Sequence, residues 1–130
     1  MHRKYISAGA IFGGLAVALG AFGAHGLEKI TTDDKVLHSF NTGVQYQMYH
    51  ALALIAVGIF SEKLQERWIH WSANCFISGI ILFSGSLYVL SYLQIQENAT
   101  AKMVGPITPV GGVFLILGWL FLWLAAVKKK

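Results

Sequence analysis

The sequence predicts an all-α integral membrane protein, a single domain in which four helices cross the bilayer as an up-down-up-down bundle. Hydrophobic residues make up 55% of the 130 residues and charged residues only 12%, whereas soluble domains carry about 25% charged residues. The mean hydropathy of +0.57 is that of a membrane protein. Four stretches also lack Asp, Glu, Lys and Arg, and each exceeds the roughly 20 residues that a helix needs to cross the hydrocarbon.

The four expected spans cover approximately residues 5–26, 36–60, 68–93 and 107–127. Backbone polar groups in lipid must be satisfied within their own segment, so the spans are expected to be helices. The linkers between the charge-free stretches, at 28–35, 62–67 and 97–102, are short. Short linkers make successive helices run antiparallel.

Lysine and arginine counts set the expected orientation, because cytoplasmic loops are rich in these residues. Seven lie on the side that holds both termini and the second linker: Arg3, Lys4, Lys63, Arg67, Lys128, Lys129 and Lys130. Only three lie on the other side: Lys29, Lys35 and Lys102. This bias predicts a multi-pass membrane protein with both termini on the cytoplasmic side.

Small residues indicate how the helices pack, since glycine lets two helix backbones approach closely in lipid. The candidate packing positions are Gly9, Gly13 and Gly20 in the first span, Gly79 and Gly85 in the third, and Gly111 and Gly118 in the fourth. We expect these faces to meet inside one chain. A contact between two copies is the alternative.

Two helix starts have local signals. Thr31 and Asp34 have capping-box spacing, which predicts that the second helix begins there and runs to about Phe60. In the fourth span, Thr108 is placed to cap a helix whose first residue is Pro109. The apolar residues 103–108 would then be irregular backbone.

The second span carries most of the polar side chains within the membrane, and the predicted topology puts polar residues of its neighbours at a similar depth. The candidate polar site comprises His25, His38, Asn41, Thr42, Gln45, Tyr49, His50, Ser84, Ser86 and Thr108. These groups could bond to one another as packing contacts. Alternatively, they could line a ligand or permeation site open to the outer face. The spans hold no acidic residue, which argues against proton-coupled transport.

Other chemistry has little support in the sequence. His25 and His38 flank the first linker and could ligate haem. However, no metal-binding or catalytic motif is present, so we predict no metal or cofactor and the sequence does not indicate an enzyme. The basic residues end apolar runs, which suits lipid headgroups rather than nucleic acid.

Four segments resemble a known family: GAFGAHG at 20–26, TGVQYQMYH at 42–50, FSGSLY at 83–88 and GPITPVGG at 105–112. They are similar to the YgdD/YwdK-like family of small bacterial inner-membrane proteins of unknown function, which has a small transmembrane relative in eukaryotes. The resemblance implies a four-span inner-membrane protein and brings no reaction. Eight residues lie in the family's recognisable segments: His25, Gln45, Tyr49, His50, Ser84, Ser86, Thr108 and Pro109.

Three functions follow as hypotheses. The first is a structural or accessory protein that acts by helix packing with itself or with a larger membrane complex. The second is a small-solute or ion pathway, which predicts a water-filled outer cavity lined by His38, Asn41, Gln45 and Thr108. The third is a haem-binding redox protein. Apart from lipid, the expected partners are a second copy or a larger membrane complex, with no nucleic acid.

Overall fold

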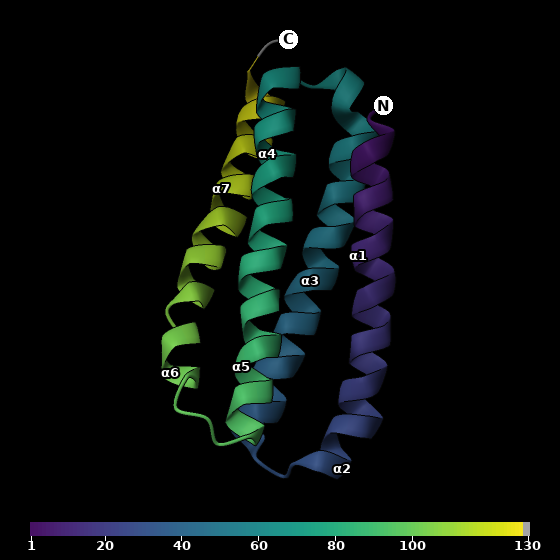
Figure 1. Ribbon diagram of the computed structural model, residues 1–130. Helices are drawn as coiled ribbons and strands as arrows, with labels where there is room; N and C mark the ends of the chain where they lie inside the picture. The colour runs from purple at the N-terminus through teal and green to yellow at the C-terminus, as the bar shows by residue number, and fades with distance from the viewer. Residues whose placement is uncertain (129–130) are drawn as a thin grey trace.

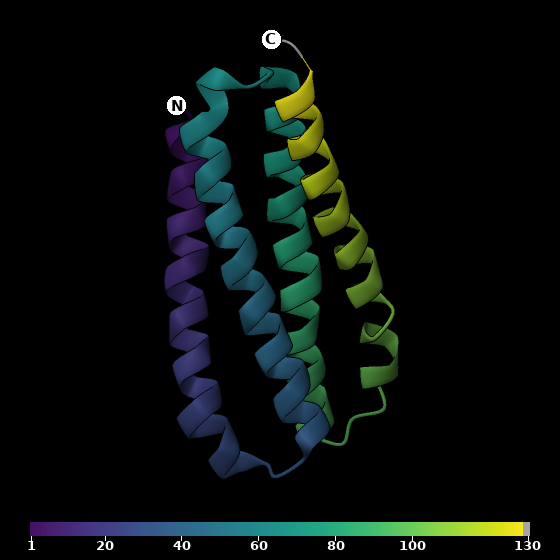
Figure 2. The same cartoon turned by 180° about the vertical axis from the view of Figure 1, so that it is seen from behind.

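The computed structural model describes residues 1–128, and within that range the chain is helical with no strand. Four long helical segments lie side by side in chain order and alternate in direction, so the start of the first segment and the end of the fourth lie at the same end of the molecule (Figure 1). The view from behind shows the same order, with α1 and α7 at the two edges (Figure 2). The predicted all-α up-down-up-down arrangement is confirmed. Lys129 and Lys130, two residues of the predicted charge bias, lie outside the described residues.

The first and third segments each contain a π-helical turn. The first comprises α1 (Arg3–Phe22), the π turn η1 (Gly23–Leu27) and α2 (Glu28–Ile30). The second is α3 (Asp34–Phe60), followed by the 3₁₀ turn η2 (Ser61–Lys63). The third comprises α4 (Glu66–Gly79), the π turn η3 (Ile80–Ser84) and α5 (Gly85–Ile95). The fourth comprises α6 (Ala101–Val104) and α7 (Ile107–Val127). We call the end with the termini the terminal end and the opposite end the distal end.

Within residues 1–128, three helical stretches are long and apolar enough to cross a membrane: Arg3–Ile30, Glu66–Ile95 and Ala101–Val127. The remaining long helix, α3, has 27 residues, or about 40 Å at 1.5 Å per residue. Its length therefore suffices, but polar side chains between His38 and His50 reduce its hydropathy. It packs between α1 and the third segment.

Glycines lie where the segments approach most closely. A Cβ atom on Gly9 would stand 2.7 Å from the Ala51 carbonyl oxygen of α3, and one on Gly118 would stand 2.5 Å from the Phe76 ring. The remaining predicted packing glycines differ in how tightly they are enclosed. A Cβ on Gly79 would stand 2.5 Å from the Leu115 side chain, and one on Gly111 would meet the backbone of Phe83. A Cβ on Gly20 would stand 3.3 Å from Val44, and one on Gly13 would stand 3.9 Å from Ala51. Gly85 departs from the expectation, because a Cβ there would meet nothing within 4 Å.

The start of α3 corrects the predicted cap. The cap is Asp33, whose carboxylate accepts a hydrogen bond of 2.9 Å from the Lys35 N–H. The Thr31 hydroxyl oxygen instead accepts from the Asp33 N–H, within the linker. Asp33 prevails because its backbone is extended and its side chain reaches the first free N–H groups of the helix.

The start of α7 also differs from the prediction. α7 begins at Ile107, so Thr108 lies inside its first turn rather than capping it, and Pro109 is its third residue. Proline is tolerated there because the first N–H groups of a helix have no intrahelical partner. Residues 103–104 belong to the short helix α6, so the irregular backbone is confined to Gly105 and Pro106.

Candidate functional site

The polar residues of α3 divide into an inward and an outward group. Gln47 and His50 face the packed interior, where they are 3% and 5% exposed. Their spacing of three places them with the buried Gly43 and Leu54 on one side of the helix. The outward group lies on the opposite side.

Gln47 joins three segments. Its side-chain amide donates a 2.7 Å hydrogen bond to the Phe12 carbonyl of α1. Its amide oxygen accepts a 2.6 Å hydrogen bond from the Tyr88 hydroxyl of α5. Both ends of the buried amide are therefore satisfied, and a side chain that would be costly to bury alone becomes a cross-link between helices.

His50 is held just as completely. Its Nδ1 lies 2.7 Å from the Tyr46 carbonyl oxygen, and its Nε2 accepts a 2.9 Å hydrogen bond from the Trp119 indole of α7. The carbonyl can only accept and the indole can only donate, so the proton is assigned to Nδ1. Both ring nitrogens are in use, and His50 serves as a packing contact between α3 and α7.

Serine hydroxyls make further hydrogen bonds between segments. Ser84 donates to the Gly43 carbonyl of α3, and Ser72 donates to the Gly118 carbonyl of α7, each at 2.7 Å. The Ser86 hydroxyl donates its single proton to the carbonyl of Phe83. Thr108 must therefore be the donor in the 2.6 Å bond between the Thr108 and Ser86 hydroxyls.

The outward group forms a continuous row, which we call the α3 stripe: His38, Asn41, Gln45 and Tyr49. All four are exposed, Tyr49 to 55%. Their spacing of three, four and four keeps them on one side of the helix. Gln45 lies eleven residues after the start of α3, or about 16 Å along the axis.

The ten predicted polar residues are therefore not gathered around one space. His50, Ser84, Ser86 and Thr108 bond inside the packed helices. The α3 stripe faces outward, and His25 is exposed on η1. Thr42 is half-buried on α3.

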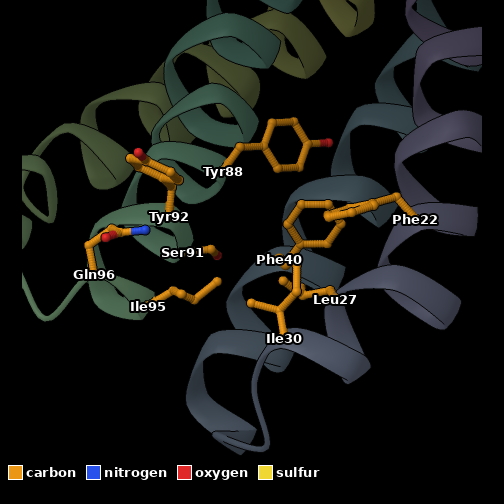
Figure 3. A pocket seen from close by; sticks show the side chains of 9 residues that line it. All are labelled: Phe22, Leu27, Ile30, Phe40, Tyr88, Ser91, Tyr92, Ile95 and Gln96. Carbon is orange, nitrogen blue, oxygen red and sulfur yellow. The ribbon is translucent and has the colours of Figure 1, made fainter.

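A pocket at the distal end differs in chemistry from the expected polar cavity. It has a volume of about 200 Å³ and nine lining residues: Phe22, Leu27, Ile30, Phe40, Tyr88, Ser91, Tyr92, Ile95 and Gln96. Figure 3 shows the apolar side chains of the first two segments on one side and the residues of α5 on the other. The Ser91 hydroxyl donates to the Leu87 carbonyl, so it is already satisfied. None of the four residues expected to line an outer cavity is among these nine.

A cluster at the terminal end was not anticipated from the sequence. His2, Glu66 and His70 bring three potential ligand atoms together, and Tyr5 contacts His70. Glu66 and His70 are four apart on α4, a spacing visible in the sequence. His2 joins them only because α1 and α4 meet at this end, which no local pattern indicates.

Together, the membrane-length apolar helices and the satisfied polar groups between them define a small helical membrane protein. The chain matches the family model described as "Protein of unknown function (DUF423)" over residues 19–112. It therefore belongs to the DUF423 family, and the resemblance to the YgdD/YwdK-like family is confirmed.

The relatives are similar over nearly their whole length. The chain is 50% identical to the UPF0382 membrane protein YwdK of Bacillus subtilis over 128 residues, covering 97% of this chain and 98% of that one. It is 38% identical to a UPF0382 membrane protein of Haemophilus influenzae, covering 100% and 98%. A eukaryotic relative, UPF0382 membrane protein C1782.12c of Schizosaccharomyces pombe, is 38% identical, covering 85% and 90%. No solved structure matches the chain.

Proposed function

We propose that this chain is a structural protein of the cell inner membrane that acts by assembling with a second copy of itself through the α3 stripe. In this arrangement all four helical segments cross the membrane and both termini are cytoplasmic. The observation that supports the proposal is the contrast within α3, whose inward polar groups are bonded while its outward ones lie uncovered.

The energy of an uncovered amide in lipid is the reason for expecting a partner. Moving an amide from water to an apolar medium without a hydrogen bond costs about 2–7 kcal/mol, depending on the reference state. Asn41 and Gln45 each carry one such amide. Gln45 lies about 16 Å along the axis from the start of α3. Its side chain is too short to reach the membrane surface from that depth.

The chemistry of the stripe fits a second copy in particular. Two copies inserted in the same orientation and related by a two-fold axis along the membrane normal place each α3 residue at the depth of its counterpart. An amide both donates and accepts, so Asn41 and Gln45 can each pair with the same residue of the other copy. The stripe also has no Asp, Glu, Lys or Arg that would repel its own image. Interhelical bonds of this kind contribute about 0.6–2 kcal/mol each.

Cysteine cross-linking in intact membranes tests the proposal. The native thiol is removed by Cys75→Ser, and single cysteines are placed at Asn41 or Gln45. Matched controls are cysteines at Val17 on α1 and Ile116 on α7, which are 62% and 68% exposed. We expect disulfide-linked dimers from the two stripe positions and not from the controls.

Two results would contradict self-assembly. One is equal cross-linking at all four positions, which would indicate random collision. The other is a stripe cysteine that links only to a different membrane protein, which would make the chain an accessory subunit of a larger complex.

A further inference from the structure

Three side chains from two helices converge at the terminal end. His2 precedes α1, while Glu66 and His70 lie on successive turns of α4. The Nε2 atom of each histidine lies 3.5 Å from the same carboxylate oxygen, Glu66 Oε1. All three atoms lie within 4.8 Å of one another, and the two imidazole ring centres are 4.7 Å apart.

The two nitrogen–oxygen separations match the dimensions of a tetrahedral metal site. Zinc bonds to histidine nitrogen and carboxylate oxygen are about 2.0–2.2 Å long. Two ligands of a regular tetrahedron with such bonds stand about 3.3–3.6 Å apart. The two nitrogen–oxygen distances of 3.5 Å therefore fall within the range for ligands of one ion.

Tyr5 supplies the outer contact that a histidine ligand requires. Its hydroxyl lies 2.5 Å from Nδ1 of His70, the nitrogen that faces away from Glu66. Metal-bound histidines hold the proton on their other nitrogen and donate it to a neighbouring acceptor, which fixes the ring. With the Nδ1 proton donated to the Tyr5 oxygen, the lone pair of Nε2 faces the common point.

We propose that His2, Glu66 and His70 form a Zn²⁺ site that ties the start of the chain to α4. Two imidazoles and one carboxylate are a ligand set that zinc takes readily, leaving a fourth position for water or a small ligand. The cluster borders a surface pocket of about 140 Å³ lined by Met1, His2, Ser61, Glu62 and Glu66. That pocket gives the fourth position access to solvent. The inference is independent of pairing through the α3 stripe, which lies on a different helix.

Zinc titration of the purified full-length protein tests the site. The protein keeps its native start, carries a histidine-free tag at its C-terminus, and is stripped of metal before ZnCl₂ is added in a calorimeter. We expect one Zn²⁺ per chain. His2→Ala and Glu66→Gln should abolish binding, and Tyr5→Phe should weaken it about 10–100-fold.

The control is His25→Ala, which removes an exposed distal histidine outside the α3 stripe and should leave zinc binding unchanged. His2 precedes the first helix, so His2→Ala disturbs no helix and decides the test even if another variant fails to fold. Absence of binding to the native protein would overturn the proposal. Unchanged affinity in His2→Ala would also overturn it.

Discussion

Gly111 lies where α7 packs closely against the backbone of the π turn η3, so adding one methyl group there should separate the two segments. In Gly111→Ala, the new Cβ would lie 2.7 Å from the Leu82 carbonyl carbon and from the Phe83 Cα, and closer still to the Phe83 nitrogen. Comfortable carbon–carbon contacts are about 3.5–4.0 Å. Because all three neighbours are backbone atoms, no side chain can rotate away, and the segments must move apart by about 1 Å.

The expected cost follows from two opposing terms. Overpacking of this kind costs about 1–3 kcal/mol, and exchanging glycine for alanine in a helix returns about 1 kcal/mol. Gly111→Ala should therefore lower the free energy of unfolding by up to about 2 kcal/mol. The same exchange at Gly85, where a Cβ meets nothing within 4 Å, should leave stability unchanged or raise it by up to about 1 kcal/mol.

Reversible unfolding in mixed detergent micelles, followed by helical circular dichroism, measures both variants against the native protein. The comparison isolates packing, because both variants add the same methyl group to a helical glycine. Equal stability of Gly111→Ala and Gly85→Ala would contradict the expected overpacking at Gly111. It would mean that the contact between α7 and η3 is not close in the folded protein.

Two further predictions concern the hydrogen bonds of Gln47 and the orientation of the chain. Gln47→Leu should lower the free energy of unfolding by about 1–3 kcal/mol, because it leaves the half-buried Tyr88 hydroxyl without its acceptor; the same unfolding assay checks it, and native-like stability would show that these hydrogen bonds are dispensable. In cells with a cysteine-free background, a cysteine at Lys102 should react with an impermeant thiol reagent from outside, whereas one at Lys63 should react only after the membrane is broken. The reverse pattern would invert the proposed orientation.

The helical fold could be predicted because an apolar composition and long charge-free stretches indicate that the chain lies in a lipid bilayer. Four apolar stretches with short linkers leave few arrangements other than antiparallel helices. Most small residues were also informative, since a glycine such as Gly9 marks a surface that another helix can approach. Gly85 shows the limit of that argument, because a missing side chain permits a contact without requiring one.

The sorting of polar residues on α3 was harder to predict. Gln45 and Gln47 stand two positions apart, so they point to nearly opposite sides of the helix. Both are glutamines, so residue type does not distinguish the inward one from the outward one. Gln47 was not among the predicted site residues, although it makes the hydrogen bonds that join three segments. One signal was available, since Gln47 shares its face with the apolar Phe40 and Leu54, which indicates an interior position.

Some features depend on tertiary contacts that no local pattern encodes. The two π turns arise without a sequence signature, and η3 lies where Gly43 and Gly111 approach the third segment from two neighbours. The cluster at the terminal end joins residues 2 and 66, which are brought together only because the ends of α1 and α4 converge there.

The most direct test of self-assembly through the α3 stripe is native mass spectrometry of the protein released from lipid nanodiscs. If the chain dimerises through the α3 stripe, we expect a species of twice the 14.3 kDa chain mass. This species should fall to the single-chain mass when Asn41 and Gln45 are both changed to leucine. The dimer should persist when Asn74, an exposed amide on α4, is changed in the same way. A single-chain mass for the native protein, or a dimer that survives loss of both stripe amides, would contradict self-assembly through the α3 stripe.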